Sequence, residues 1–346
     1  MTTSNPSNQS KQNSVNDIRR FSRMRPTVGI EIGSNSIYMV QLRGSSEGKL
    51  SFEKCKSFDF NPQLDLDTPA FATVLKNALK EFCGSSRGLS IWAAPKLDRA
   101  RLHHIKIPRV KPSRLSGAVY WAVQKEERFL ESETVVDFYV EESTDLGERT
   151  DLNITCALAD REDIEAIEQA FANAGFSLTG IGLPLFALRN VVSLRGDVAP
   201  QSPALVCQLG QRATSVSVLH EQRLVFSRNI PLGIDSLADA LVKELGPKQS
   251  KGDATKLILN LGSDKKKLSA EEKEEHERIF HLLLPILERL VRQFDRTIQY
   301  YQSNFNTDPI ETIFLGGETA AKGYVFDFIS GAHGRCQGKI HIWLHQ

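Results

Sequence analysis

The sequence predicts an α/β protein of two related lobes, the first of which carries an inserted α+β subdomain. An apolar strand, a glycine turn and a second alternating strand occur from Val28 to Arg43, and the same pattern returns from Leu205 to His220. A third apolar strand enters the pair Gly316 and Gly317 before a helix start. Glycine at a bend lets backbone N–H groups approach an anion closely, so the paired hairpins predict a two-lobed phosphate clamp.

The composition is that of a globular protein and argues against several classes. At 346 residues the chain is long enough for two domains of usual size. Its formal net charge of +1 gives no reason to expect nucleic acid as a partner. The five cysteines form no C-x-x-C pair, which argues against zinc and a disulfide framework and favours a reducing cytoplasm. Because no apolar run approaches the ~20 residues that span a bilayer, we expect a membrane role only through a partner.

Residues 26–190 are predicted to form the first lobe, after a disordered tail over residues 1–25 that is rich in Ser, Asn and Gln. Beyond the first hairpin, residues 49–60 alternate as a third strand of the same sheet. Apolar residues then recur at helical spacing over residues 68–82. The lobe is therefore expected to begin as a sheet with a helix packed against it.

The inserted α+β subdomain is expected over about residues 88–160. The patterns predict strands at 88–95, 101–108, 135–141 and 152–159 and a helix at 113–130, followed by a helix at 161–174 that Gly175 ends. His103 and His104 are adjacent on one strand, where neighbouring side chains point to opposite faces, so they are not expected to share a metal ion. Trp121 and Phe129 are expected in the core.

Residues 191–346 are predicted to form the second lobe, which contains the second hairpin and the glycine pair. The charged runs at 265–267 and 271–275 mix lysine and glutamate, and we expect them to be solvated. The segment from Arg292 to Asn304 precedes the strand that enters the glycine pair. The chain ends in a short strand near Ile340.

Taken in order, these segments resemble the actin, sugar-kinase and heat-shock-chaperone ATPase superfamily, in which each lobe gives a phosphate hairpin. Within it the chain is identified as a member of the type IV pilus assembly protein PilM family, which is related to the cytoplasmic part of the type II secretion L subunit. The resemblance covers Val28 nearly to the C-terminus. It rests on V-G-I-E-I-G-S-N-S-I, L-H-H-I-K-I-P-R-V-K-P-S-R-L, the bridge from Asn173 to Asn190, F-S-R-N-I-P-L-G-I-D-S-L-A and R-Q-F-D-R-T-I-Q-Y-Y-Q-S-N.

This resemblance implies an actin-like ATPase fold of two ribonuclease-H-like lobes that bind ATP and Mg²⁺ between them. It also implies a cytoplasmic bacterial scaffold at the inner face of the inner membrane, which docks the N-terminal cytoplasmic peptide of a PilN-like protein. The motor ATPase of the machine and a second copy of the chain are further expected partners. No catalytic residue is assigned and Glu31 is the candidate metal residue. The candidate cofactor-binding residues are Gly33, Ser34, Asn35, Gly210, Gln211, Arg212, Thr214, Gly316, Gly317 and Glu318.

The nucleotide site departs from the family pattern at several positions. The family has aspartate before each hairpin glycine, whereas this chain has Glu31 in the first hairpin and Gln208 in the second. Mg²⁺ prefers carboxylate and phosphate oxygens, so the amide of Gln208 weakens the metal site. Thr255 also stands where the adenosine-binding helix should offer a glutamate. The sequence therefore predicts a degenerate ATP site, a pseudo-ATPase in which nucleotide binding is weakened and hydrolysis is not expected.

Two other functions stay open at this stage. The first is an active ATPase or small-molecule kinase of the same superfamily, which needs a carboxylate base and a competent magnesium site. The second is a cell-division filament protein of the FtsA kind, which shares the two lobes but anchors itself by a C-terminal amphipathic helix.

Overall fold

The fold was established from a computed structural model of the chain. The structure describes residues 25–33, 35–44, 50–61, 64, 66–95, 100–141, 151–195, 202–221, 223–246, 250–261, 268–305, 309–317, 324–334 and 339–342. The chain divides into two compact units, Met1–Pro184 and Leu185–Gln346. The expected tail lies outside the described residues, apart from Arg25.

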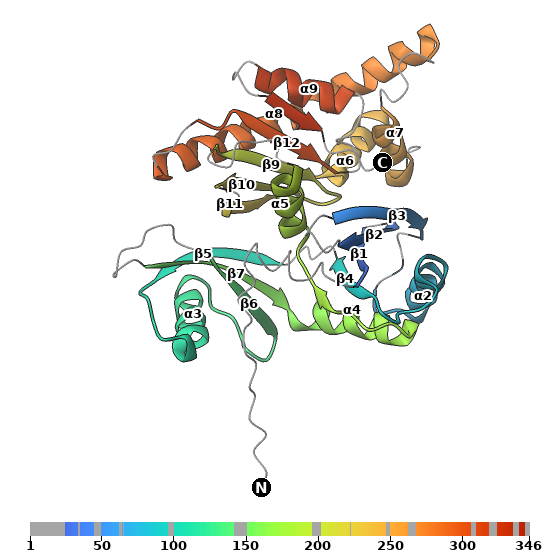
Figure 1. The fold of residues 1–346 in the computed structure, drawn as a ribbon. Helices are drawn as coiled ribbons and strands as arrows, with labels where there is room; N and C mark the ends of the chain where they lie inside the picture. The colour runs from blue at the N-terminus through green and yellow to red at the C-terminus, as the bar shows by residue number, and fades with distance from the viewer. Residues whose placement is uncertain are drawn as a thin grey trace. The chain divides into compact units, whose positions relative to one another are not determined.

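The first unit is built on a five-stranded sheet in the order β3-β2-β1-β4-β8. The strands are β1 (Thr27–Ile32), β2 (Ser36–Gly44), β3 (Leu50–Asp59), β4 (Ser90–Pro95) and β8 (Gly180–Ile181). Alternate residues of β1, namely Val28, Ile30 and Ile32, are buried in a core that they share with α2 (Pro69–Cys83) and α4 (Arg161–Ala174). Both helices therefore pack on the same face of this sheet (Figure 1).

The inserted subdomain is a separate three-stranded sheet in the order β5-β7-β6, with α3 on one face (Figure 1). Its elements are β5 (Arg101–Ile107), α3 (Pro112–Glu126), β6 (Thr134–Glu141) and β7 (Leu152–Asp160). Residues 90–95 were expected here, but they form β4, which pairs in parallel with β1, so the first strand of the insert begins at Arg101. Its helix ends at Glu126 instead of near residue 130, because Glu127 adopts an extended backbone.

The second unit repeats the arrangement with a sheet in the order β11-β10-β9-β12-β13. The strands are β9 (Ala204–Leu209), β10 (Thr214–His220), β11 (Arg223–Ile230), β12 (Thr312–Gly316) and β13 (Lys339–Ile342). One face packs against α6 (Ile234–Leu245), α7 (Lys251–Asn260), α8 (Ala270–Phe305) and α9 (Tyr324–Gly334). The opposite face packs against α5 (Pro184–Arg195).

The two hairpins match in detail as well as in order. The Gly33 N–H donates to the Ser36 carbonyl at 2.9 Å, and the Gly210 N–H donates to the Ala213 carbonyl at 3.0 Å. In each unit the first strand also runs parallel to the fourth, β1 with β4 and β9 with β12. The predicted repeat of hairpins is confirmed.

Candidate functional site

The glycine pair lies beside the second hairpin. Gly316 is in register with Gln208 across β12 and β9, so both strands end at the same edge of the sheet. Gly317 has a φ of +111°, and a Cβ atom there would lie 2.2 Å from the Leu209 carbonyl oxygen. The structure therefore brings Gly210, Gly316 and Gly317 together by direct backbone packing.

The hairpin loop is also held by the start of α6. The Ile234 N–H donates to the Gly210 carbonyl at 3.0 Å and the Asp235 N–H to the Gln211 carbonyl at 2.8 Å. The Gln211 side-chain amide donates to the Asp235 carboxylate. The first N–H groups of the helix are thus satisfied by the loop, in place of the capping groups that a free helix start needs.

Gly233 makes this contact possible, and the sequence analysis did not single it out. A Cβ atom at this position would lie 2.5 Å from the Gln211 carbonyl oxygen. The available signal was a glycine directly before the helical pattern I-D-S-L-A, where glycine is a common N-cap residue. That signal predicts the helix start, but no local sequence pattern predicts that the Gln211 carbonyl packs against Gly233.

Two predicted phosphate contacts of the second hairpin differ in accessibility. Thr214 is fully buried and its hydroxyl donates to the Leu232 carbonyl at 2.6 Å. The hydroxyl therefore fastens β10 to the turn that precedes α6. Arg212 is exposed in the loop, where a guanidinium could reach an anion.

Gln208 faces the side of the sheet that α5 covers. Its neighbour across the hairpin is Ser215, and both line a small pocket. The remaining lining residues are Leu185, Leu188, Arg189, Val206, Ser217 and Leu219. None of these side chains is a carboxylate, so the residues around Gln208 do not fit a magnesium ion.

The first hairpin presents Glu31, Gly33 and Asn35 at the end of β1. Glu31 is in register with Tyr38 on β2 and with Ala94 on β4. Asn35 is exposed, its carbonyl accepts the Phe60 N–H at 2.7 Å, and its side-chain oxygen accepts the Ser36 hydroxyl at 3.3 Å. These residues belong to the first unit, so the structure describes each half of the predicted clamp by itself. Ser34 and Glu318 lie outside the described residues.

The helix expected at the adenosine is α7, and its first turn is bonded to protein groups. The Thr255 hydroxyl donates to the Lys251 carbonyl of its own helix at 2.9 Å. The Lys251 ammonium lies 3.0 Å from Asp239 and 3.6 Å from Asp235, and the hydrogen bond to Asp239 raises the pKa of Lys251. This turn therefore holds α7 against α6.

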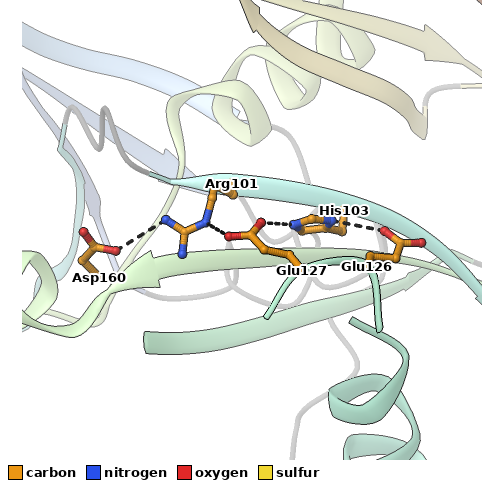
Figure 2. Close-up of polar contacts among 5 residues, drawn as sticks. All are labelled: Arg101, His103, Glu126, Glu127 and Asp160. Carbon is orange, nitrogen blue, oxygen red and sulfur yellow. Dashed lines mark hydrogen bonds and ion pairs between the residues drawn. The ribbon is translucent and has the colours of Figure 1, made fainter. Parts of the chain in front are cut away.

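The two adjacent histidines diverge as predicted. The ring nitrogens of His103 lie 3.2 Å from Glu126 and 2.9 Å from Glu127, as Figure 2 shows. The Nδ1 atom of His104 instead lies 3.1 Å from the Thr155 hydroxyl, and burial lowers the pKa of His104 to about 4. Across the described ranges, no group of three His, Cys, Asp or Glu side chains is arranged to hold a metal ion.

Comparison with known proteins gives one family match and several structural matches. The family model described as type IV pilus assembly protein PilM matches residues 29–331. The chain is similar to a solved PilM-PilN type IV pilus biogenesis complex, at 18% identity and a TM-score of 0.73, over 92% of this chain and 88% of that chain. It is also similar to ethanolamine utilization protein EutJ from Carboxydothermus hydrogenoformans, at 13% identity and a TM-score of 0.48, over 95% of this chain and 90% of that chain.

A further match is MreB5 of Spiroplasma citri bound to ADP, at 10% identity and a TM-score of 0.47, over 92% of each chain. At 18% identity the match to the PilM-PilN complex concerns the fold, and with the family match it supports the actin-like ATPase fold that the sequence predicts. The family match extends from β1 into α9 and thus spans both units. The chain therefore belongs to the family of type IV pilus assembly protein PilM.

Proposed function

We propose that this protein is a scaffold of a type IV pilus or related secretion machine that docks the cytoplasmic N-terminal segment of a PilN-like inner-membrane protein. The support is the likeness to a PilM-PilN complex over 92% of the chain. No helix in the described part of the chain is long and apolar enough to cross a membrane. In this proposal the protein works in the cytoplasm and the partner recruits it to the inner membrane. The motor ATPase and a second copy are further proposed partners.

We further propose that the ATP site between the two hairpins is degenerate. The observation that carries this is Gln208, a neutral side chain in a pocket lined by serine, arginine and apolar residues. The glycine-lined backbone of the hairpins still suits phosphate. ATP bound between the hairpins would contact both units and favour the state in which they meet. Nucleotide would then act as a regulator of docking, and hydrolysis is not expected.

The partner half of this proposal is tested by peptide binding. The full chain is titrated into a fluorescent peptide that carries the N-terminal cytoplasmic sequence of the PilN-like protein of the same bacterium. A scrambled peptide of the same composition is the control. We expect the fluorescence anisotropy of the native peptide to rise to saturation as protein is added, and that of the scrambled peptide to stay unchanged. Equal signals from both peptides, or none from either, would overturn the docking role.

The nucleotide half is tested by calorimetric titration with ATP, with and without Mg²⁺. We expect weak binding that Mg²⁺ changes little, and Gln208→Asp should make binding depend on Mg²⁺ because it restores a carboxylate. Arg212→Ala should weaken binding, because it removes the exposed guanidinium that could meet the phosphates. Gly210→Val should abolish binding, because a Cβ there would lie 2.8 Å from the Ala213 carbonyl oxygen. Steady ATP turnover that Gly210→Val removes would favour the enzyme alternative.

A further inference from the structure

We propose that the outward face of α3 binds the surface of an anionic lipid bilayer directly. This face is the stripe of Arg114, Gly117, Trp121 and Lys125, which follow one another at spacings of three, four and four residues. All four are exposed. The opposite face of α3 carries the buried Val119 and Val123, which pack on the three-stranded sheet.

Trp121 is the central residue of this face. It was expected in the core, but its side chain is 68% exposed, because Val119 and Val123 take the positions that point toward the sheet. Its ring meets Tyr120 edge-on at a centroid distance of 5.6 Å, and Tyr120 meets Phe129 in the same way at 5.5 Å. The Trp121 ring is thus supported from one side while most of its surface faces solvent. Tryptophan is enriched at binding interfaces, because its ring is apolar while its indole N–H can meet a polar partner.

Four cations lie on α3 or next to its ends. Lys111 precedes the helix, Arg114 and Lys125 lie on its outward face, and Arg128 follows its end; all four are exposed. The structure shows no ion pair for any of them among the residues it describes. Of the nearby acids, Glu126 contacts His103, and Glu127 contacts both His103 and Arg101 (Figure 2). Glu131 and Glu133 are exposed in the segment after the helix, outside the stripe that carries Trp121.

The same ion network fixes the orientation of the face. Arg101 lies 2.6 Å from Glu127 and 3.5 Å from Asp160 at the start of α4, and it shares Glu127 with His103 (Figure 2). These contacts join the end of α3 to β5. The side of the helix that carries Trp121 is therefore held outward before any ligand arrives, which lowers the entropy lost on binding.

A lipid surface suits this face better than a peptide does. The face is a convex helix surface, and a Cβ atom on Gly117 would meet nothing within 4 Å, so no groove encloses the tryptophan there. Tryptophan and basic side chains together favour the interface of an anionic membrane, where each Lys or Arg contributes about 1 kcal/mol. Leu130, which is 61% exposed, adds a second apolar side chain beside the cations.

Vesicle flotation of the full chain tests this proposal without any protein partner. Vesicles of phosphatidylcholine mixed with phosphatidylglycerol should float the protein at low salt, and phosphatidylcholine vesicles should not. High salt should release the protein, since screening weakens contacts between surface charges and lipid headgroups. Trp121→Ala and the double variant Arg114→Glu with Lys125→Glu should each reduce the bound fraction about tenfold or more, the latter because it reverses two charges.

Two matched controls distinguish binding by this face from non-specific adsorption of the protein to vesicles. Phe52→Ala removes another aromatic residue of the first unit, 63% exposed, and Arg289→Glu with Arg292→Glu reverses two exposed charges on α8. Both controls should float like the unchanged protein. Absence of flotation with anionic vesicles, or equal losses in the controls and the α3 variants, overturns the proposal. Binding to polyglutamate without binding to vesicles also overturns it, because the face would then recognise acidic protein. Since no PilN-like peptide is present, none of these outcomes decides the docking role.

Discussion

Gly317 passes Leu209 so closely that no side chain fits between them. The φ of +111° at Gly317 belongs to the region that glycine adopts readily, and the 2.2 Å distance from a Cβ atom to the Leu209 oxygen leaves no relaxed alternative. The same carbonyl precedes Gly210, where the second hairpin turns. The glycine pair at the end of β12 therefore supports the hairpin whether or not a nucleotide is bound.

Replacing Gly317 with alanine should destabilise the protein by about 2 kcal/mol or more, because backbone strain and the clash add together. The melting temperature of the full chain measures this. Gly331→Ala is the matched control, since that glycine lies within α9 and a Cβ there meets nothing within 4 Å. The control should raise stability by about 0.5–1 kcal/mol. Equal melting temperatures for the two variants would contradict the packing described at Gly317.

Thr214→Val should lower stability by about 1–3 kcal/mol, because it leaves the buried Leu232 carbonyl without its hydroxyl donor. Thr255→Val removes a hydroxyl that bonds to Lys251 on the exposed side of α7, where water can replace it. That variant should stay within about 0.5 kcal/mol of the original protein. Urea unfolding of both variants tests the contrast, and a large loss in Thr255→Val would show that α7 depends on this bond.

The insert should lose stability as the pH falls from 6.5 toward 4. Burial first, and the nearby charge of His103 second, lower the pKa of His104 from 6.5 to about 4. The unfolded chain then binds the proton before the folded chain does, so acid favours unfolding across this window, by up to about 3 kcal/mol. Above pH 6.5 the group is neutral in both states and contributes no pH dependence.

The His104→Asn variant checks the origin of this acid sensitivity. The Thr155 hydroxyl donates to Glu141 at 3.1 Å, so it accepts from Nδ1–H of His104. An asparagine amide can donate to the same hydroxyl, but it does not titrate. Thermal unfolding at pH 7 and pH 5 should show a smaller difference for the variant than for the original protein. Identical differences would assign the acid sensitivity to other groups.

The rate of thiol alkylation should differ between the exposed and the buried cysteines of the described chain. Cys55 is exposed on β3, whereas Cys156 and Cys207 are buried. Burial raises the pKa of Cys156 to about 12 and also raises the pKa of Cys207, so neither forms a thiolate readily. Brief alkylation of the native protein followed by peptide mass spectrometry should label Cys55 and leave Cys156 and Cys207 unmodified. Early labelling of Cys207 would mean that the second sheet opens locally.

The sequence predicts the strands and hairpins well because local patterns of apolar residues and glycine specify them. Alternating apolar residues and a glycine turn specify β1 with β2 and β9 with β10, and the structure has both pairs. Trp121 was misplaced because residue type alone favours the core, while Val119 and Val123 decide which face of α3 is buried. Gly233 was missed because its contact joins segments whose pairing no local pattern records. The assignment of the candidate cofactor-binding residues to one nucleotide site remains a prediction. The structure brings together only those candidates that lie within the same unit.

The identical strand orders of the two sheets have an evolutionary meaning. In the first unit the insert stands between β4 and α4, and in the second unit the chain passes from the matching strand, β12, to α9 and then β13. Such a chain is what duplication of one ancestral half leaves behind when later growth is confined to connections. The first unit carries a whole subdomain after its fourth strand, and the second unit carries additional helices before its fourth strand. A duplicated half would thus keep its strand ladder while its connections diverge, which is the pattern of these two units.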